Sequence, residues 1–281
     1  PRTYTTQAVV PVWEEGRQLL EVDPERAHDL LVDGLEVALK ESKGLGENEL
    51  HVQVPLVLLE LGKSFLKQNA SSEASSAFEH AVQYFDQILH VGGKEKKAPV
   101  EVEEKLLRQR YVESMLHLAK LRYLTGSDGA EHMWKKSISY AVRHLGKDAY
   151  EILVASNGLA ELLLEQLRLP EAERFAAASA ELAKQLLADG STFARRVQER
   201  LIEAVVMQGL GRVQQQDLDG GLKLYQEALA QLEDLEKREG GVVDNYLRSG
   251  FFNLYRNIEH VYKSKGQDDM ANATKDLSNS K

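Results

Sequence analysis

Several residues of this sequence could bind a metal or perform acid–base catalysis, but their spacing does not form a site. Eight histidines are present and cysteine is absent, which excludes disulfides, thiolate zinc sites and cysteine nucleophiles. Glu25 and His28 form the only Glu-x-x-His sequence, whereas a diiron bundle requires two such pairs. Asp86 and His90 share a helix face, an arrangement more typical of a surface contact. We therefore predict no metal site.

The motifs of phosphate binding and nucleophilic catalysis are also absent. The sequence 92–94, Gly-Gly-Lys, lacks the glycine spacing and the preceding strand of a P-loop. No Gly-x-Ser-x-Gly motif occurs, and the serine pairs 71–72 and 75–76 fit the cap and first turns of a helix. We predict no catalytic residue and no cofactor, and hence a protein that is not an enzyme.

Charge and hydropathy restrict the partners and the compartment. The net charge of -9 disfavours nucleic acids and anionic lipid surfaces as partners. The longest apolar run, 52–61, contains Glu60 and is too short for a transmembrane segment. We expect an intracellular, soluble protein, with the cytoplasm favoured. Because the sequence begins at Pro1 without an initiator methionine, an organelle reached after presequence removal stays open.

Proline and glycine divide the chain into helices. Five prolines lie at expected helix starts: Pro11, Pro24, Pro55, Pro99 and Pro170. Glycines lie at the expected ends, for example Gly126, Gly190, Gly240 and Gly241. Apolar residues recur every three to four positions between these points. The predicted helices span 8–21, 24–42, 49–68, 72–90, 100–125, 129–145, 148–167, 170–188, 192–215, 218–238, 242–264 and 267–277.

A pattern of small residues recurs in these helices. Its clearest copy has Leu58, Leu61, Gly62 and Phe65 on one helix and Ala74, Phe78 and Ala81 on the next. This spacing resembles the tetratricopeptide repeat (TPR), a helical hairpin in which small residues let two backbones approach. Further copies are centred on Ala172 and Gly221, and poorer ones on Ala130 and Ala27. Trp13 and Trp134 are expected to anchor the core or the hairpin interfaces.

The resemblance implies an all-α fold. We expect a right-handed α-solenoid of about five to six antiparallel helix hairpins. The copies lie 47, 56, 42 and 49 residues apart, which exceeds the usual 34, so longer helices than standard are predicted. Residues 1–264 are predicted to form a single TPR-like domain, followed by a polar C-terminal tail at 265–281. Residues 92–104 are predicted to form a charged linker loop.

The resemblance also implies a binding groove. Members of this family hold a peptide or a partner helix on the concave face formed by the first helix of each hairpin. The matching positions give this candidate groove: Lys63, Lys67, Met115, Arg122, Tyr123, Asn157, Glu161, Glu165 and Gln214. Apolar neighbours complete it: Leu56, Leu59, Leu66, Leu164, Val206 and Leu210. For each apolar member, packing against the next helix is the alternative.

These patterns favour a scaffold or adaptor that joins protein partners, as a subunit or an assembly factor of a larger complex. The alternative is an acidic TPR-type chaperone that shields a basic client, which the net charge of -9 permits. A clamp for chaperone C-terminal tails is disfavoured, since Ala119, Glu161 and Leu210 stand where the resemblance requires cations or asparagine.

Overall fold

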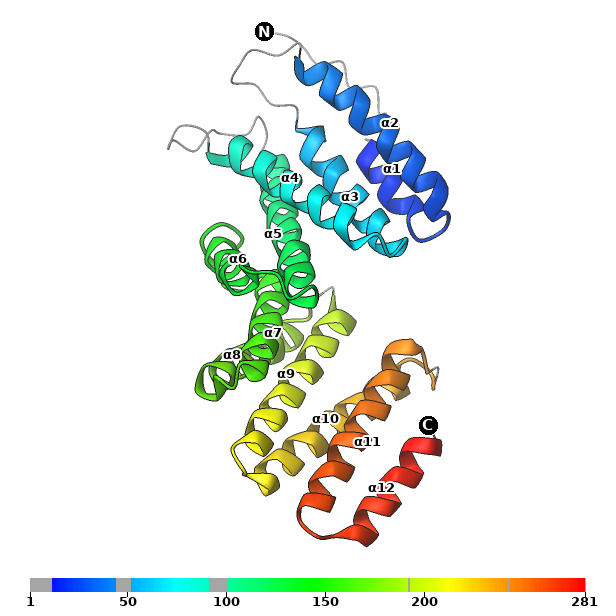
Figure 1. Cartoon of the computed structure of the whole chain (residues 1–281), viewed down its shortest axis with the longest axis vertical. Helices are drawn as coiled ribbons and strands as arrows, with labels where there is room; N and C mark the ends of the chain where they lie inside the picture. The colour runs from blue at the N-terminus through cyan, green and yellow to red at the C-terminus, as the bar shows by residue number, and fades with distance from the viewer. Residues whose placement is uncertain (1–11, 44–51, 91–100, 192, 242, 281) are drawn as a thin grey trace. The chain divides into compact units, whose positions relative to one another are not determined.

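The structure is a computed structural model that describes residues 12–43, 52–90, 101–191, 193–241 and 243–280. Within these ranges it contains α-helices and no strand (Figure 1). The helices form two compact units, Pro1–Leu145 and Gly146–Lys281. The first unit contains α1 (Val12–Leu19), α2 (Pro24–Lys43), α3 (Gln53–Lys67), α4 (Ser71–His90), α5 (Glu101–Leu124) and α6 (Ala130–His144). The second contains α7 (Tyr150–Glu165), α8 (Leu169–Ala188), α9 (Ala194–Gln214), α10 (Leu218–Arg238), α11 (Asn245–Ser264) and α12 (Asp268–Ser280).

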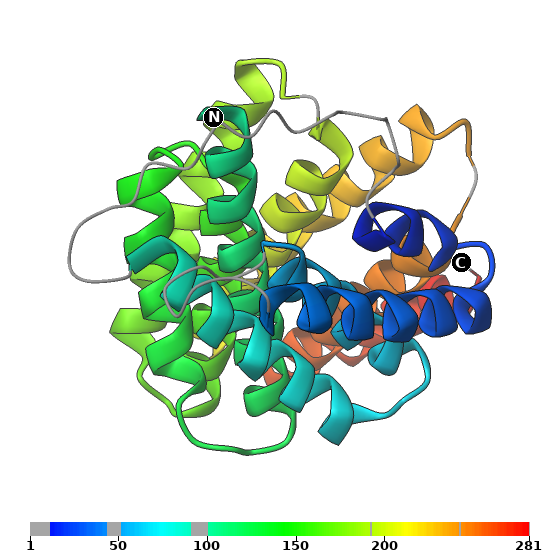
Figure 2. The same ribbon diagram turned by 90° about the horizontal axis from the view of Figure 1, so that it is seen from above.

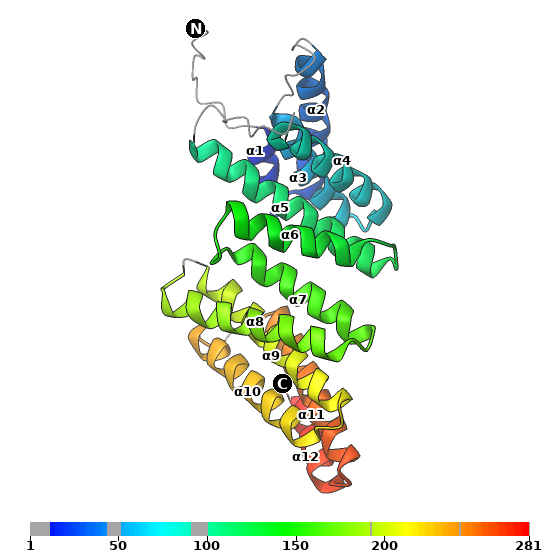
Figure 3. The ribbon, with the colours of Figure 1, turned by 90° about the vertical axis from the view of Figure 1, so that its left-hand side faces the viewer.

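Consecutive helices in each unit pack as antiparallel hairpins, which Figures 2 and 3 show from two further sides. We call the odd-numbered helices, which open the hairpins, the A helices, and the even-numbered helices the B helices. In the first unit, α3 packs against both α1 and α5 as well as against its own partner α4. In the second unit, α9 packs against α7 in the same way. Successive A helices are thus neighbours along α1, α3 and α5 and along α7 and α9.

The A helices α3, α5, α7, α9 and α11 end in the same turn. Its first residue has a φ between 58° and 68° and is Asn69, Gly126, Leu167, Gln216 or Gly266. In each turn the next N–H bonds back to the last helical turn; for example, Asp217 N donates to Arg212 O over 2.9 Å. This is the Schellman closure, which satisfies carbonyl groups at the helix end. A repeated turn gives each of these hairpins the same local geometry.

Small residues set the distance between paired helices. A Cβ atom added to Gly209 of α9 would lie 2.7 Å from the ring of Tyr225 on α10. The same atom on Gly62 of α3 would lie 2.6 Å from the ring of Phe78 on α4. Such distances are below van der Waals contact, so only glycine permits this approach. The large aromatic ring fills the space that the missing side chain leaves.

The fold class and the repeat pattern predicted from the sequence are confirmed. Ala74 and Ala172 are 0% and 1% exposed, and Trp13 and Trp134 are 6% and 3% exposed, as expected for crossing and anchoring residues. The predicted helix starts at 8, 49, 192 and 242, and linker residues 92–100, lie outside the described residues. Residues 101–104 were included both in the predicted linker 92–104 and in the predicted helix 100–125, and they belong to α5.

The segment at 265–281, predicted as a polar tail with a helix near 267–277, contains α12. This helix packs against α11. Ala271 and Thr274 are its buried residues, 1% and 6% exposed, while most of its other side chains are exposed. A polar composition therefore suffices here because α12 buries only a narrow stripe.

Two glycines of α9 provide a matched test of the close approach. We expect Gly209→Ala to lower the free energy of unfolding by about 1–3 kcal/mol, because its Cβ would overlap the Tyr225 ring. Gly211→Ala should leave stability unchanged or raise it by about 0.5–1 kcal/mol, since its Cβ would lie 3.5 Å from Leu164. Urea unfolding measures both variants. Equal effects would show that α9 and α10 do not cross at Gly209.

Candidate partner-binding face

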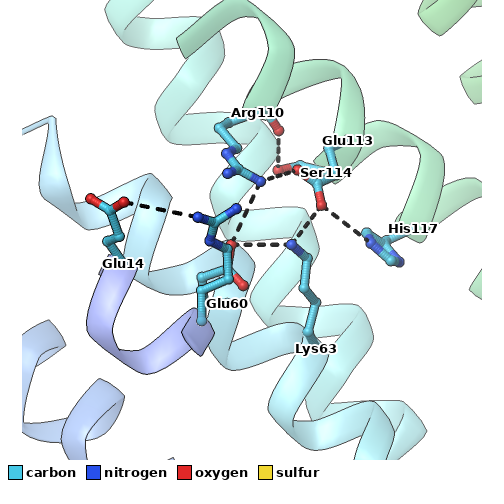
Figure 4. A network of polar contacts seen from close by, with 8 residues as sticks. Glu14, Glu60, Lys63, Arg110, Glu113, Ser114 and His117 are labelled. Carbon is cyan, nitrogen blue, oxygen red and sulfur yellow. Dashed lines mark hydrogen bonds and ion pairs between the residues drawn. The ribbon is translucent and has the colours of Figure 1, made fainter. Parts of the chain in front are cut away.

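Charged side chains on α3 and α5 form one cluster in the first unit (Figure 4). We call Glu60, Lys63, Arg110, Glu113 and His117 the Glu60–Glu113 network. Lys63 Nζ lies 3.1 Å from Glu60 Oε1 and 2.5 Å from Glu113 Oε1. Arg110 lies 2.6 Å from Glu113 and 3.9 Å from Glu60. Two carboxylates therefore share two cations across the α3–α5 contact.

Glu60 is the buried end of this network. Its side chain is 0% exposed, and desolvation raises its pKa even though Lys63 opposes the shift. Its Oε2 atom is buried and has no hydrogen-bond partner among the described residues. A buried carboxylate is costly unless it is paired, so Lys63 is the main compensation for the charge of Glu60.

Glu113 and His117 form the partly exposed end of the network. Burial alone would raise the pKa of Glu113, but Lys63 and Arg110 lower it to about 2. Desolvation lowers the pKa of His117 to about 4, so the ring is neutral at pH 7. His117 stacks on Phe78, with 4.9 Å between ring centroids and 7° between planes. The side chains of Glu113 and His117 are 30% and 32% exposed, so a partner could reach this end.

The network also attaches α1. The guanidinium groups of Arg110 and Arg17 lie 5.5 and 5.9 Å from the ring centroid of Trp13. Trp13 is buried, and Arg17 in turn lies 3.9 Å from Glu14. Cation–π contacts of this kind stabilise by about 0.5–2 kcal/mol. All three A helices of the first unit are thus joined by charged and aromatic side chains.

The predicted groove residues of the first unit have different environments. Lys63 belongs to the network, and Lys67 pairs with Glu21 at 2.9 Å near the α1–α2 turn. Arg122 pairs with Glu79 of α4 at 2.8 Å. Tyr123 packs beside Trp134, with 5.6 Å between ring centroids. Met115 is 0% exposed and belongs to the core, so it is not available to a partner.

The remaining predicted residues lie in the second unit. Asn157 is 4% exposed, and its Nδ2 donates to Arg200 O over 2.9 Å and to Glu203 over 3.2 Å, which joins α7 to α9. Glu161 and Glu165 are exposed on α7. Gln214, the last residue of α9, is half-buried. The two glutamates are therefore the accessible members of this set.

The apolar residues of the predicted groove are mostly packing residues. This agrees with the alternative that they pack against the next helix. Leu56, Leu59 and Leu164 are 4%, 0% and 3% exposed. Leu66 and Val206 are half-buried, while Leu210 is 36% exposed. The apolar end of the predicted groove is thus largely filled by helix–helix contacts.

Four network members were missed by the sequence reasoning, namely Glu60, Arg110, Glu113 and His117. A signal existed for three of them. Glu60 is a lone charge within an apolar helical run, and Arg110 precedes Glu113 by three residues, one helical turn. What the sequence lacked was the contact between α3 and α5, because Lys63 and Glu113 are far apart in the chain.

Across the described residues there is no group of three or more histidine, aspartate or glutamate side chains that could hold a metal ion. In the same residues, no helix combines the length and the apolar composition that crossing a membrane requires.

Comparison with known proteins gives structural relatives only. No family model matches the chain, and no curated protein matches it in sequence. BtubC (BKLC) from P. vanneervenii is similar with a TM-score of 0.66 and 16% identity, over 92% of this chain and 90% of that one. The apo form of RapI is similar with a TM-score of 0.58 and 10% identity, over 95% and 94%. A putative kinesin light chain from Podosopora anserina with TPR-like repeats follows at a TM-score of 0.47 and 14% identity, over 79% and 92%.

The fold is a TPR-like α-solenoid. The TPR-like arrangement explains why the network lies where it does. In such a stack each A helix touches the preceding and the following A helix, so their shared side collects residues from successive hairpins. The Glu60–Glu113 network lies on this A-helix side, which we call the A-helix face.

Low pH should remove the contribution of the Glu113 carboxylate to the free energy of unfolding. Its folded-state pKa of about 2 lies below its ordinary value of 4.5, so its stabilisation is present above pH 4.5 and is lost as pH falls from 4.5 towards 2. We expect Glu113→Gln to lower the free energy of unfolding by on the order of 2–3 kcal/mol at pH 7. The difference from the wild type should vanish near pH 2.

Urea unfolding at several pH values measures this difference. Glu227→Gln, at an exposed position of α10, is the matched control and should change stability by less than about 0.5 kcal/mol. A pH-independent gap between wild type and Glu113→Gln would mean that Glu113 acts through packing and not through its charge.

Proposed function

We propose that this protein is a non-enzymatic scaffold or adaptor that holds a peptide or a helix of a partner protein on its A-helix face. The observation that supports this is the side-by-side packing of A helices within each unit, with polar side chains fixed along the shared side. The Glu60–Glu113 network holds Lys63 and Glu113 in place before any partner arrives. Such preorganisation lowers the entropy lost on binding.

The accessible charges of the two units indicate the chemistry of the partners. In the first unit, Lys120 is exposed on α5, on the same helix face as Glu113 and His117. In the second unit, Glu161 and Glu165 are exposed on α7. An acidic segment suits the first surface and a basic segment suits the second. The net charge of -9 supports protein partners over nucleic acids.

Charge reversal on the A helices tests this proposal. The tagged full chain is used to isolate partners from its source cells at low and high salt, in parallel with Lys120→Glu and Glu161→Lys. Each variant is expected to lose at least one stoichiometric partner, because each reverses a charge on the A-helix face. Thermal melting must first show that the variants are folded.

Matched controls carry the same charge changes on the B helices. Lys223→Glu on α10 and Glu181→Lys on α8 alter exposed residues and should retain every partner. Partners lost only in these controls would contradict binding at the A-helix face. Recovery of nothing but basic proteins that dissociate as salt rises would favour the acidic chaperone instead.

A further inference from the structure

The α11/α12 hairpin has a hollow that the A-helix face does not include. It measures about 340 Å³ and is lined by Arg248, Ser249 and Phe252 of α11 and by Ser278 of α12. Phe252 is 48% exposed, which is unusual for a large aromatic side chain in a folded helix pair. The hollow therefore exposes apolar surface at this hairpin.

Corresponding positions in the other hairpins of the second unit are buried. Phe252 lies fourteen residues before the turn residue Gly266, and Ile202 and Leu153 hold the same place before Gln216 and Leu167. Ile202 and Leu153 are 3% and 0% exposed. The repeat thus uses this position for packing, and the α11/α12 hairpin leaves it open.

Ser278, which also lines the hollow, likewise stands at a position that the other hairpins of the second unit bury. It lies twelve residues after Gly266, a place held by Ala228 after Gln216 and by Ser179 after Leu167. Ala228 and Ser179 are 0% and 1% exposed, whereas Ser278 is half-buried. Both sides of the hollow are therefore positions that earlier hairpins bury.

The helix that covers these positions in the earlier hairpins is the next A helix. The helix α9 packs against both α7 and α8, and α11 packs against α10. One hydrophobic core contains Leu153 and Ile202 together with Leu201 of α9 and Phe251 of α11. Among the described helices of the second unit, none occupies the corresponding place beside α11 and α12. The hollow is thus the position of an A helix that this unit does not fill.

The charges at an occupied position indicate what such a helix would carry. Arg195, in the first turn of α9, pairs with Asp244 and lies 2.8 Å from Glu239. Asp244 is the N-cap of α11 and accepts a hydrogen bond from Leu247 N over 2.9 Å. The arriving A helix therefore brings an acid at its N-terminus to an arginine of the preceding A helix.

An arginine also stands beside the hollow. Arg248 lies eighteen residues before Gly266, one helical turn later than Arg195, which lies twenty-one residues before Gln216. Arg248 lies in the first turn of α11, is exposed, and has no acidic partner among the described residues. One helical turn beyond Phe252, Arg256 places its guanidinium 5.6 Å from the Phe252 ring centroid. Apolar surface and Arg248 thus line the hollow, and Arg256 lies against its Phe252, although the chain as a whole carries a charge of -9.

We propose that the α11/α12 end is a docking site for an amphipathic helix of a partner protein. The N-terminal turn of that helix carries aspartate or glutamate, which pairs with Arg248, and its apolar stripe covers Phe252. The site is separate from the A-helix face and does not depend on the function proposed for that face.

A synthetic peptide tests this site on the full chain. The probe has about 18 residues, roughly five helical turns, with Asp and two Glu in the first turn and leucine at a three- and four-residue spacing. Its control replaces the three acids with lysine. We expect saturable binding of the acidic peptide and amide NMR shifts confined to α11 and α12, with the lysine peptide binding about tenfold or more weakly.

Variants identify the contacts. Arg248→Glu should lower the affinity for the acidic peptide by about tenfold or more and raise the affinity for the lysine peptide. Arg248→Lys should retain most of the affinity for the acidic peptide. Phe252→Ala should lower the affinity for both peptides. Lys223→Glu, which makes a charge change at an exposed position of α10, should change neither affinity.

Four outcomes would overturn the proposal. The first is no saturable binding of the acidic peptide, and the second is equal affinity for wild type and Arg248→Glu. The third is sedimentation showing that the chain alone self-associates and that Phe252→Ala abolishes this, which would make a second copy the occupant. The fourth is a set of amide NMR shifts in α3 and α5 when the acidic peptide is added, which would assign the acidic segment to the A-helix face and refute docking at α11/α12.

Discussion

The close approach of paired helices at glycine and alanine is the constraint on which the rest of the structure depends. Gly62 beneath Phe78 lets α3 lie against α4, and Gly209 beneath Tyr225 lets α9 lie against α10, with no space for one more carbon atom. This distance fixes where the next A helix packs. The side-by-side A helices, and every charged contact between them, follow from it.

The Glu60–Glu113 network shows how such a stack tolerates charge in its interior. Removing Glu60 from water is unfavourable, and one of its oxygens has no hydrogen-bond partner. The compensation comes from Lys63 on the same helix and from Arg110 on the next A helix. A buried ion network adds little net stability compared with apolar packing, but it penalises wrong pairings. Its value here is the fixed position of α5 relative to α3.

Much of the fold could be predicted from the sequence, because helix starts, helix ends and small crossing residues are local signals. The candidate site was less accessible. Met115 and Lys63 both match groove positions, yet one is buried and the other is half-buried. Adjacent positions on a helix differ by about 100° in direction, so the rotation of each helix decides which residues face solvent. That rotation is set by packing between hairpins, which one sequence does not display.

The order of the packing contacts has a consequence for how the molecule unfolds. Almost every helix contact joins an element to its neighbour or next neighbour in the chain. The free energy of unfolding is then a sum of the intrinsic stabilities of the hairpins and of the interactions between neighbouring hairpins, as in a one-dimensional lattice. A hairpin at the edge of a unit can open while the interior stays folded, so amide hydrogen exchange should be fastest at such edges. Thermal unfolding of a chain built this way need not be a single two-state transition.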